Sequence, residues 1–257
     1  MIYKKSAEEI ASMRRAGRIV AHTLARLQDA IRPGVTTKEL DRIGEESIIG
    51  AGAVPSFKGY RGYPASICTS PNDVIVHGIP ADRQLEEGDI ISLDVGAFYE
   101  NFHADSAWTF AVGDISPEAA ELLRVTEGSL EAAILVCKPK ARLGDIGHAV
   151  QTAAEAGGFS VVREYAGHGV GRALHEEPSI PNFGPPGRRE VLAPGMTLAI
   201  EPMVNAGGPE TKVLSDHWTV VTADGSLSAH FEHTVAITES GYEVLTRSDD
   251  IARVAAL

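Results

Sequence analysis

The sequence predicts a mixed α/β fold, of the α+β kind, formed as one domain from two related halves. The chain has 257 residues, of which 44% are hydrophobic, enough for one large core. Segments with helical periodicity alternate with short apolar runs that are typical of strands. We predict a single domain, 1–257, formed from two halves of about 1–115 and 116–250. Adding 106 to a residue number in the first half gives a similar residue in the second. The matching pairs are Leu24 with Leu130, Ile31 with Cys137, Pro33 with Pro139, Leu40 with Ile146, and Gly52 with Gly158.

The first half is expected to begin with two helices. Ser6 and Glu9 have the spacing of a capping box, and an apolar stripe follows until Arg32-Pro33-Gly34 ends the helix. A second helix is expected from Thr36 to about Gly50. Strands are then predicted at 66–69, 74–77, 90–95 and 104–112.

The second half repeats this order. Ser116-Pro117 begins a helix that reaches Pro139, because proline is favoured in the first turn. A fourth helix spans about 145–156. We predict an ordered loop over 176–194, which holds five prolines. Further strands are predicted at 161–162, 197–204, 217–222 and 229–238.

Charge and composition exclude several classes of protein. A net charge of −12 repels phosphate backbones and argues against direct nucleic-acid binding as the main task. No apolar run is long enough to cross a membrane, and residues 1–9 lack the apolar core of a signal peptide. Cys68 and Cys137 cannot build a disulfide framework. We therefore expect a cytoplasmic protein with no membrane partner, and a monomer.

Four carboxylates lie within segments that read as apolar strands: Asp94, Asp105, Glu201 and Glu232. A carboxylate in a buried sheet costs several kcal/mol unless another group compensates its charge. One such residue is more often a solvated edge or surface group. Four of them together favour a shared site.

Asp94 and Asp105 flank a predicted hairpin whose turn is expected near Tyr99-Glu100. Residues whose numbers sum to 199 would then lie opposite each other, so the two aspartates would stand side by side on one face. Adjacent buried carboxylates repel unless a cation separates them. Two divalent ions would neutralise the four negative charges, which predicts a dinuclear metal centre.

Histidines form the next group of candidates. His168 lies between glycines that allow close backbone packing, and His175 follows seven residues later. His77 ends an apolar strand, where a lone histidine is more often a satisfied core residue. His103 sits beside the hairpin turn. His22 and His148 fall on predicted helices and are interpreted as surface or filler residues.

Several local strings resemble those of the pita-bread metallopeptidases, and together they are similar to the type I methionine aminopeptidase family. The strings are 72–80, 167–171, 175–178, 200–207 and 231–234. Individually, several also occur in prolidase and X-Pro aminopeptidase relatives. The resemblance covers nearly the whole chain. It implies a pseudo-twofold fold with a central antiparallel sheet and helices on one face.

The resemblance also implies two divalent ions, such as Co²⁺, Mn²⁺ or Fe²⁺. One ion would be held by Asp105, His168, Glu201 and Glu232, and the other by Asp94, Asp105 and Glu232. A metal-bridged hydroxide would attack the carbonyl of the first peptide bond. The activity implied is removal of the initiator methionine.

Three residues have catalytic roles by this resemblance. His175 would hydrogen-bond the scissile carbonyl, His77 would sit at the amide nitrogen, and Glu201 would relay the proton of the water. The implied partners are N-termini of peptides and nascent chains, the latter near the ribosome, with a small residue in second place.

Positions that match the family's methionine pocket are Tyr60, Tyr63, Cys68 and Trp218. An aromatic, apolar slot suits a thioether side chain. Ordinary core packing is the alternative for each ring, most of all for Trp218. A monovalent cation would be bound by Asn72, Val74 and Ser228, for which loop hydrogen bonding is an equal alternative.

Three positions depart from the family's pattern. Phe57 stands where a small residue is common, and Leu174 stands where phenylalanine is common. We hypothesise a size swap across the pocket wall. His230 replaces a common glutamine and would face the same way as Glu232 on a strand, where it would tune the metals or the pocket.

Two other functions compete with this one. An X-Pro-specific peptidase of the same fold would carry an extra N-terminal domain, and the pocket residues here suit methionine. A non-catalytic binding module would not need the complete ligand set. Comparing turnover of Met-Ala-Ser with turnover of Ala-Pro peptides distinguishes a methionine aminopeptidase from an X-Pro peptidase. Metal analysis with an Asp105→Ala control distinguishes it from a binding module.

Overall fold

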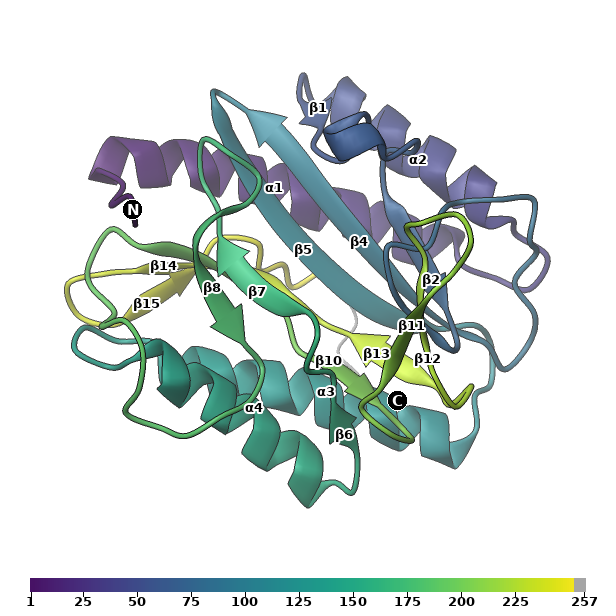
Figure 1. Ribbon diagram of the computed structural model, residues 1–257. Coiled ribbons are helices and arrows are strands. Elements are labelled where there is room, and N and C mark those ends of the chain that lie inside the picture. The colour runs from purple at the N-terminus through teal and green to yellow at the C-terminus, as the bar shows by residue number, and fades with distance from the viewer. Residues whose placement is uncertain (252–257) are drawn as a thin grey trace.

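Two pairs of helices pack against antiparallel strands in the computed structural model (Figure 1), which describes residues 1–251. Residues 252–257, the end of the expected domain, lie outside the described residues. The first half contains α1 (Ala7–Ala30), α2 (Thr37–Gly50), β1 (Val54–Pro55), a short 3₁₀ turn (Tyr60–Gly62), β2 (Cys68–Pro71), β3 (Val74–Val76), β4 (Ile90–Tyr99) and β5 (Phe102–Ala111).

The second half begins with α3 (Pro117–Leu135) and α4 (Leu143–Ala156). The strands that follow are β6 (Ser160–Val161), β7 (Ala166–Gly169), β8 (Glu176–Pro181), β9 (Thr197–Ile200), β10 (Met203–Asn205), β11 (Thr211–Val213), β12 (Val220–Thr222), β13 (Ser228–His230), β14 (His233–Ile237) and β15 (Tyr242–Val244).

The helices begin where the sequence signals them. The Ser6 hydroxyl accepts a hydrogen bond from the Glu9 amide and the Glu9 carboxylate accepts one from the Ser6 amide, so the capping box is confirmed. Ser116 caps α3 ahead of Pro117, and its hydroxyl accepts a hydrogen bond from the Ala119 amide. The 106-residue offset carries the bounds of α2 onto those of α4.

Every strand pair in the described part of the chain is antiparallel, and the mixed α/β class is confirmed. One sheet is organised around β4, which pairs with β1, β2 and β5. The largest sheet has the order β15-β14-β9-β7-β8. Two small sheets, β13-β10-β6 and β11-β12-β3, complete the strand layer.

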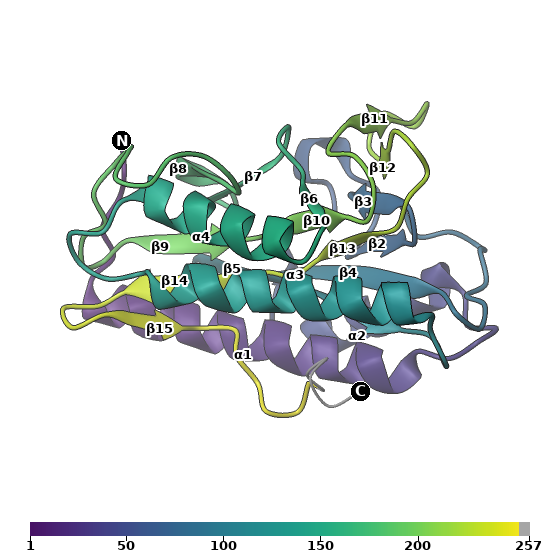
Figure 2. The same cartoon turned by 90° about the horizontal axis from the view of Figure 1, so that it is seen from below.

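Helices α1 and α2 pack on the strands of the first half, and α3 and α4 on those of the second (Figures 1 and 2). The main hydrophobic core includes Leu24 on α1 and Leu130 on α3, both fully buried. Both halves therefore share one core. No helix among residues 1–251 is long and apolar enough to cross a membrane.

The two large sheets meet where β5 crosses the start of β14. The Thr234 hydroxyl accepts a hydrogen bond from the Asp105 amide and donates one to its carbonyl, at 3.0 and 2.7 Å. The Glu232 amide donates to the Ala107 carbonyl, and the Ser106 hydroxyl donates to the Glu232 carbonyl. These bonds fix acidic segments from both halves against each other.

The predicted hairpin register was wrong by two residues. Asp94 lies opposite Ala107 and Asp105 lies opposite Gly96, so the paired numbers sum to 201. The turn is Glu100-Asn101, and both residues have positive φ, 49° and 68°, as the tight turn requires. Because the shift is even, the aspartates still share a face, although as diagonal rather than direct neighbours.

Five predicted segments also need correction. The third helix ends at Leu135 rather than at Pro139, and only Val220–Thr222 of the segment 217–222 forms a strand. The strand over 197–204 is interrupted at Glu201-Pro202, because proline has no amide hydrogen for the ladder. The strand over 229–238 is interrupted at Phe231-Glu232, where the Glu232 amide bonds to β5 instead. Glu201 and Glu232 thus lie between strands. The expected loop over 176–194 begins with a strand, β8.

Candidate metal centre and adjoining pocket

Five elements bring the predicted metal-binding side chains together. Asp94 projects from β4, Asp105 from β5 and His168 from β7. Glu201 and Glu232 occupy the interruptions after β9 and before β14. An interruption turns a side chain out of the regular alternation of a strand, so both glutamates can point into the same space.

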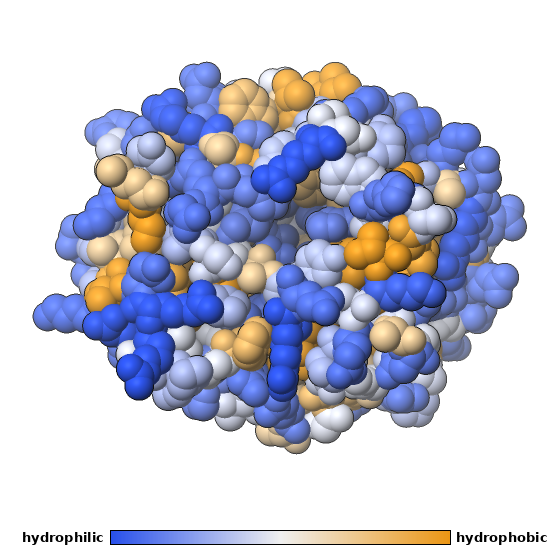
Figure 3. Space-filling view, viewed as in Figure 1, coloured by the Kyte–Doolittle hydropathy of each residue, from blue (hydrophilic) through white to orange (hydrophobic). Residues whose placement is uncertain are grey.

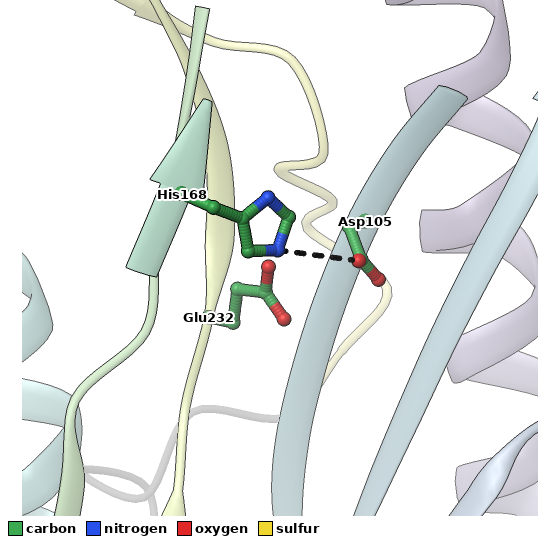
Figure 4. Close-up of side chains that lie close together, drawn as sticks. All are labelled: Asp105, His168 and Glu232. Atoms are coloured by element: carbon green, nitrogen blue, oxygen red, sulfur yellow. Dashed lines mark ion pairs between the residues drawn. The ribbon is translucent and has the colours of Figure 1, made fainter. Parts of the chain in front are cut away.

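Asp105, His168 and Glu232 form one group, with one ligand atom of each within 4.8 Å of the others (Figure 4). His168 Nε2 lies 4.0 Å from Asp105 Oδ2 and 3.7 Å from Glu201 Oε1. Adjacent ligands of one transition-metal ion have separations only slightly below these. Divalent metal binding is therefore within reach of this centre.

The ring of His168 is held in one tautomer. Its Nδ1 lies 2.9 Å from the Gly169 carbonyl, which can only accept, so Nδ1 carries the hydrogen. The lone pair of Nε2 is thereby directed at the carboxylates, the arrangement found for histidines that bind metals.

Buried charge dominates the electrostatics of the centre. Burial raises the pKa of Asp94 to about 6 and that of Glu201 to about 7. Burial and the neighbouring carboxylates raise the pKa of Asp105 and of Glu232 well above the usual range. One oxygen each of Asp94, Asp105 and Glu232 is buried without a hydrogen-bond partner. Unpartnered oxygens in an oxygen-rich set with one imidazole fit a hard or borderline divalent ion.

A cavity of about 190 Å³ opens on this centre. Its apolar end is formed by Phe57, Tyr63, Cys68, Leu174 and Trp218, with Tyr60 and Val76 beside them. Tyr63 and Trp218 meet edge to face at 5.1 Å. Figure 3 shows a hollow near the middle of this face, bordered mainly by hydrophilic residues. The four residues predicted to form a side-chain pocket therefore line one cavity.

Phe57 and Leu174 both belong to this pocket wall, so the two departures from the family's pattern are neighbours of the same space. The Phe57 ring lies over Gly96 of β4; a Cβ on Gly96 would come within 2.8 Å of it. A glycine two residues beyond Asp94 thus makes room for the larger ring.

His175 and His77 lie at the junction of the two parts of the cavity. His175 stacks on Tyr60, and its Nδ1 is 2.9 Å from the Tyr60 hydroxyl. Its ring centroid lies 4.1 Å from that of His168. His77 meets Tyr165 and Trp218 edge to face.

Both rings are neutral at physiological pH. Desolvation in the cavity, joined by the nearby His168, lowers the pKa of His175 to about 3, although its edge reaches solvent. Desolvation also lowers the pKa of His77 to about 4. A neutral imidazole can donate one hydrogen bond and accept another.

The remaining predicted residues have clear places. His22 and His148 are exposed, and His103 bonds to the Ser56 hydroxyl beside the hairpin turn. His230 is buried with Nε2 directed at Glu201. The Asn72 carbonyl accepts a hydrogen bond from the Ser228 amide, and Val74 pairs with Val221. The monovalent-cation site of these residues stays a prediction.

Sequence reasoning missed the polar residues that hold the predicted ligands in place. Asn182 donates to the Glu201 carbonyl at 2.9 Å, and Thr234 and Ser106 fix Asp105 and Glu232 as described. Tyr165, beside His77, was also missed. Small polar residues inside apolar strands were the available signal, because such groups seek partners when buried.

Known proteins resemble this chain over nearly its whole length. The profile of Metallopeptidase family M24 matches residues 11–239. A protein named methionine aminopeptidase 1 from Bacillus subtilis is 57% identical over 247 residues, covering 96% of this chain and all of its own.

Solved structures agree as well. A methionine aminopeptidase from Thermotoga maritima superposes with a TM-score of 0.95 at 48% identity, covering 96% of this chain and all of its own. A prolidase from Pyrococcus furiosus shares the fold, with a TM-score of 0.79 at 23% identity over 96% of this chain and 66% of its own.

Proposed function

The chain belongs to Metallopeptidase family M24, and on that premise we propose that it is a metal-dependent aminopeptidase that removes the N-terminal methionine of peptides and nascent proteins. One observation supports this above the others. An apolar pocket adjoins a group of carboxylates, and two neutral histidines line the same cavity.

We assign two ions to the centre. Asp105, His168, Glu201 and Glu232 would hold one, and Asp94, Asp105 and Glu232 the other. Four carboxylates with raised pKa values need about four positive charges to become ionised together, and two divalent ions provide them. When bound, such ions polarise the scissile carbonyl and lower the pKa of a water molecule.

The remaining chemistry belongs to the side chains. The apolar pocket would take the methionine side chain, with Tyr60, Tyr63, Cys68 and Trp218 in its wall. His175 would donate a hydrogen bond from Nε2 to the scissile carbonyl, because the Tyr60 hydroxyl can occupy Nδ1. His77 would face the amide nitrogen.

Proton transfer is assigned to Glu201. Glu201 lies at the centre, with Oε1 3.7 Å from His168 Nε2, and a carboxylate at this place could accept a proton from water and return it to the departing amine. The same residue would bind metal through its other oxygen.

The test is turnover of Met-Ala-Ser by protein loaded separately with Co²⁺, Mn²⁺ or Fe²⁺, with metal content measured on the same samples. We expect methionine release that disappears on chelation and returns on reloading. Release from Ala-Pro peptides with none from Met-Ala-Ser would instead identify the X-Pro peptidase alternative. Absence of release from both at full metal occupancy would favour a binding module.

A further inference from the structure

We infer that His230 is a positioning residue for Glu201, donating a hydrogen bond from Nε2 to Oε2 and so directing Oε1 toward the metal centre. This inference rests on the proposed function, because it concerns the orientation of the Glu201 carboxylate, the proposed base and metal ligand.

The two oxygens of Glu201 face two different imidazoles. His168 Nε2 lies 3.7 Å from Oε1, and His230 Nε2 lies 3.5 Å from Oε2. Among residues 1–251, these histidines are the basic side chains within 4.0 Å of the carboxylate. The Glu201 carboxylate therefore lies between two imidazoles, with His168 at one oxygen and His230 at the other.

His230 is built into the fold rather than loosely placed. His230 is 2% exposed, and its backbone amide and carbonyl both bond to Thr109 on β5. The Thr109 hydroxyl accepts from the His230 amide at 2.9 Å and donates to the His230 carbonyl at 2.8 Å. Because these bonds fix the backbone of His230 in a short strand, its imidazole ring is placed close to Glu201.

The Nε2 atom of His230 is buried and has no hydrogen-bond partner. An unpartnered buried nitrogen is costly, and Glu201 Oε2 is a carboxylate acceptor 3.5 Å from it. A closing movement of about half an ångström would complete the bond. Ionised carboxylates only accept hydrogen bonds, so an N–H is the group that this position favours.

Direct metal binding by His230 fits the distances less well. Within the described chain, no oxygen of Asp94, Asp105 or Glu232 lies within 4.0 Å of His230 Nε2. His230 Nε2 is therefore farther from each of these three carboxylates than it is from Glu201 Oε2, which lies at 3.5 Å. The ring thus acts on Glu201, and through Glu201 on the ion.

The experiment compares His230→Gln, which keeps an N–H donor, with His230→Leu, which has none. His148→Leu on the exposed face of α4 is the matched control for loss of a histidine. The readouts are the dissociation constant for Co²⁺ by titration calorimetry, the visible absorption spectrum of the Co²⁺-loaded protein, and the melting temperature without metal.

We expect His230→Leu to weaken Co²⁺ binding by about 10- to 100-fold and to change the absorption bands, as loss of an orienting partner does. His230→Gln should stay within about threefold of the wild-type constant. Equal binding by all variants would overturn the inference. So would equal losses in His230→Leu and His230→Gln, because that result would identify the ring nitrogen itself as a ligand.

Two measurements keep these outcomes separate from other failures. If His230→Leu does not fold, His230→Asn replaces it, since its shorter amide cannot reach Glu201. The wild-type protein is assayed with Met-Ala-Ser in parallel. An inactive, fully loaded wild type would refute the proposed function, whereas an active wild type with an unaffected His230→Leu would refute only the role of His230.

Discussion

The two parts of the cavity are stabilised in opposite ways. In the apolar pocket, Phe57, Tyr63 and Leu174 pack on one another, and their burial contributes to stability without any ligand. In the metal centre, Asp94, Asp105 and Glu232 each bury an oxygen with no partner. The pocket is thus complete as folded, whereas the centre is complete only when cations neutralise it.

This difference shows how the fold supports a costly site. The unpartnered carboxylates lie where Thr234 and Ser106 already join two sheets, through hydrogen bonds to the backbone rather than to the carboxylates. The scaffold therefore holds the ligand positions without using up the ligand oxygens. A substitution in the centre should act on ion binding, and a substitution in the pocket on substrate binding.

The largest effect is expected from Asp105→Ala. Asp105 is 4% exposed and belongs to both proposed ion sites. Its loss should lower turnover of Met-Ala-Ser by about 10³-fold or more, because metal polarisation provides several kcal/mol. Metal content should fall in the same samples.

Asp82→Ala is the control, since Asp82 is exposed and pairs with Lys38 at the surface. A folded Asp105→Ala protein that retains both full metal content and activity would contradict the assignment of the centre. Without metal, this variant should melt at a higher temperature than the wild type, because one buried carboxylate is gone.

Ion binding should weaken as the pH falls. The pKa of Glu201 is raised from 4.5 to about 7 and that of Asp94 from 3.8 to about 6 in the metal-free protein. Below these values an incoming ion must displace protons, so we expect the apparent affinity to fall by about 100-fold between pH 8 and pH 5.5.

The sign for stability follows from the same shifts. A carboxyl group with a raised pKa in the folded state destabilises the fold above that pKa, and this penalty is absent below its unfolded value. The rise in melting temperature on adding metal should therefore grow from pH 5.5 to pH 8. A rise that is independent of pH would contradict proton competition. The Asp105→Ala variant provides the reference series.

Tyr60 joins the two parts, and Tyr60→Phe tests that link. The hydroxyl is 2.9 Å from His175 Nδ1 while the ring lines the pocket. Removing the hydroxyl should lower kcat by about tenfold and leave KM for Met-Ala-Ser nearly unchanged, because the apolar wall remains. Tyr3→Phe, at an exposed tyrosine, is the control. A change confined to KM would assign Tyr60 to the pocket alone.

The contrast between the two parts also explains what could be predicted from sequence. Charged residues in apolar strands are rare enough that Asp94 and Asp105 could be singled out and paired on one face. The exact register could not, because the residues of the Glu100-Asn101 turn reveal its type only weakly. The pocket rested on the resemblance, since a buried Tyr63 or Trp218 reads as ordinary core. The interruption at Glu232 depends on a contact with β5, distant in sequence, whereas the one at Glu201 could have been predicted from Pro202.

The smallest effect is expected at the pocket wall, in Phe57→Cys. Phe57 and Leu174 line the same space, so a smaller residue at position 57 should enlarge the pocket and raise KM for Met-Ala-Ser by about fivefold, with metal content unchanged. The paired change Phe57→Cys with Leu174→Phe should restore KM, because volume is exchanged across the wall. Unchanged kinetics in the single variant would refute the size swap. A double variant worse than either single one would show that the two side chains act independently, leaving the pocket's selectivity to Tyr63 and Trp218.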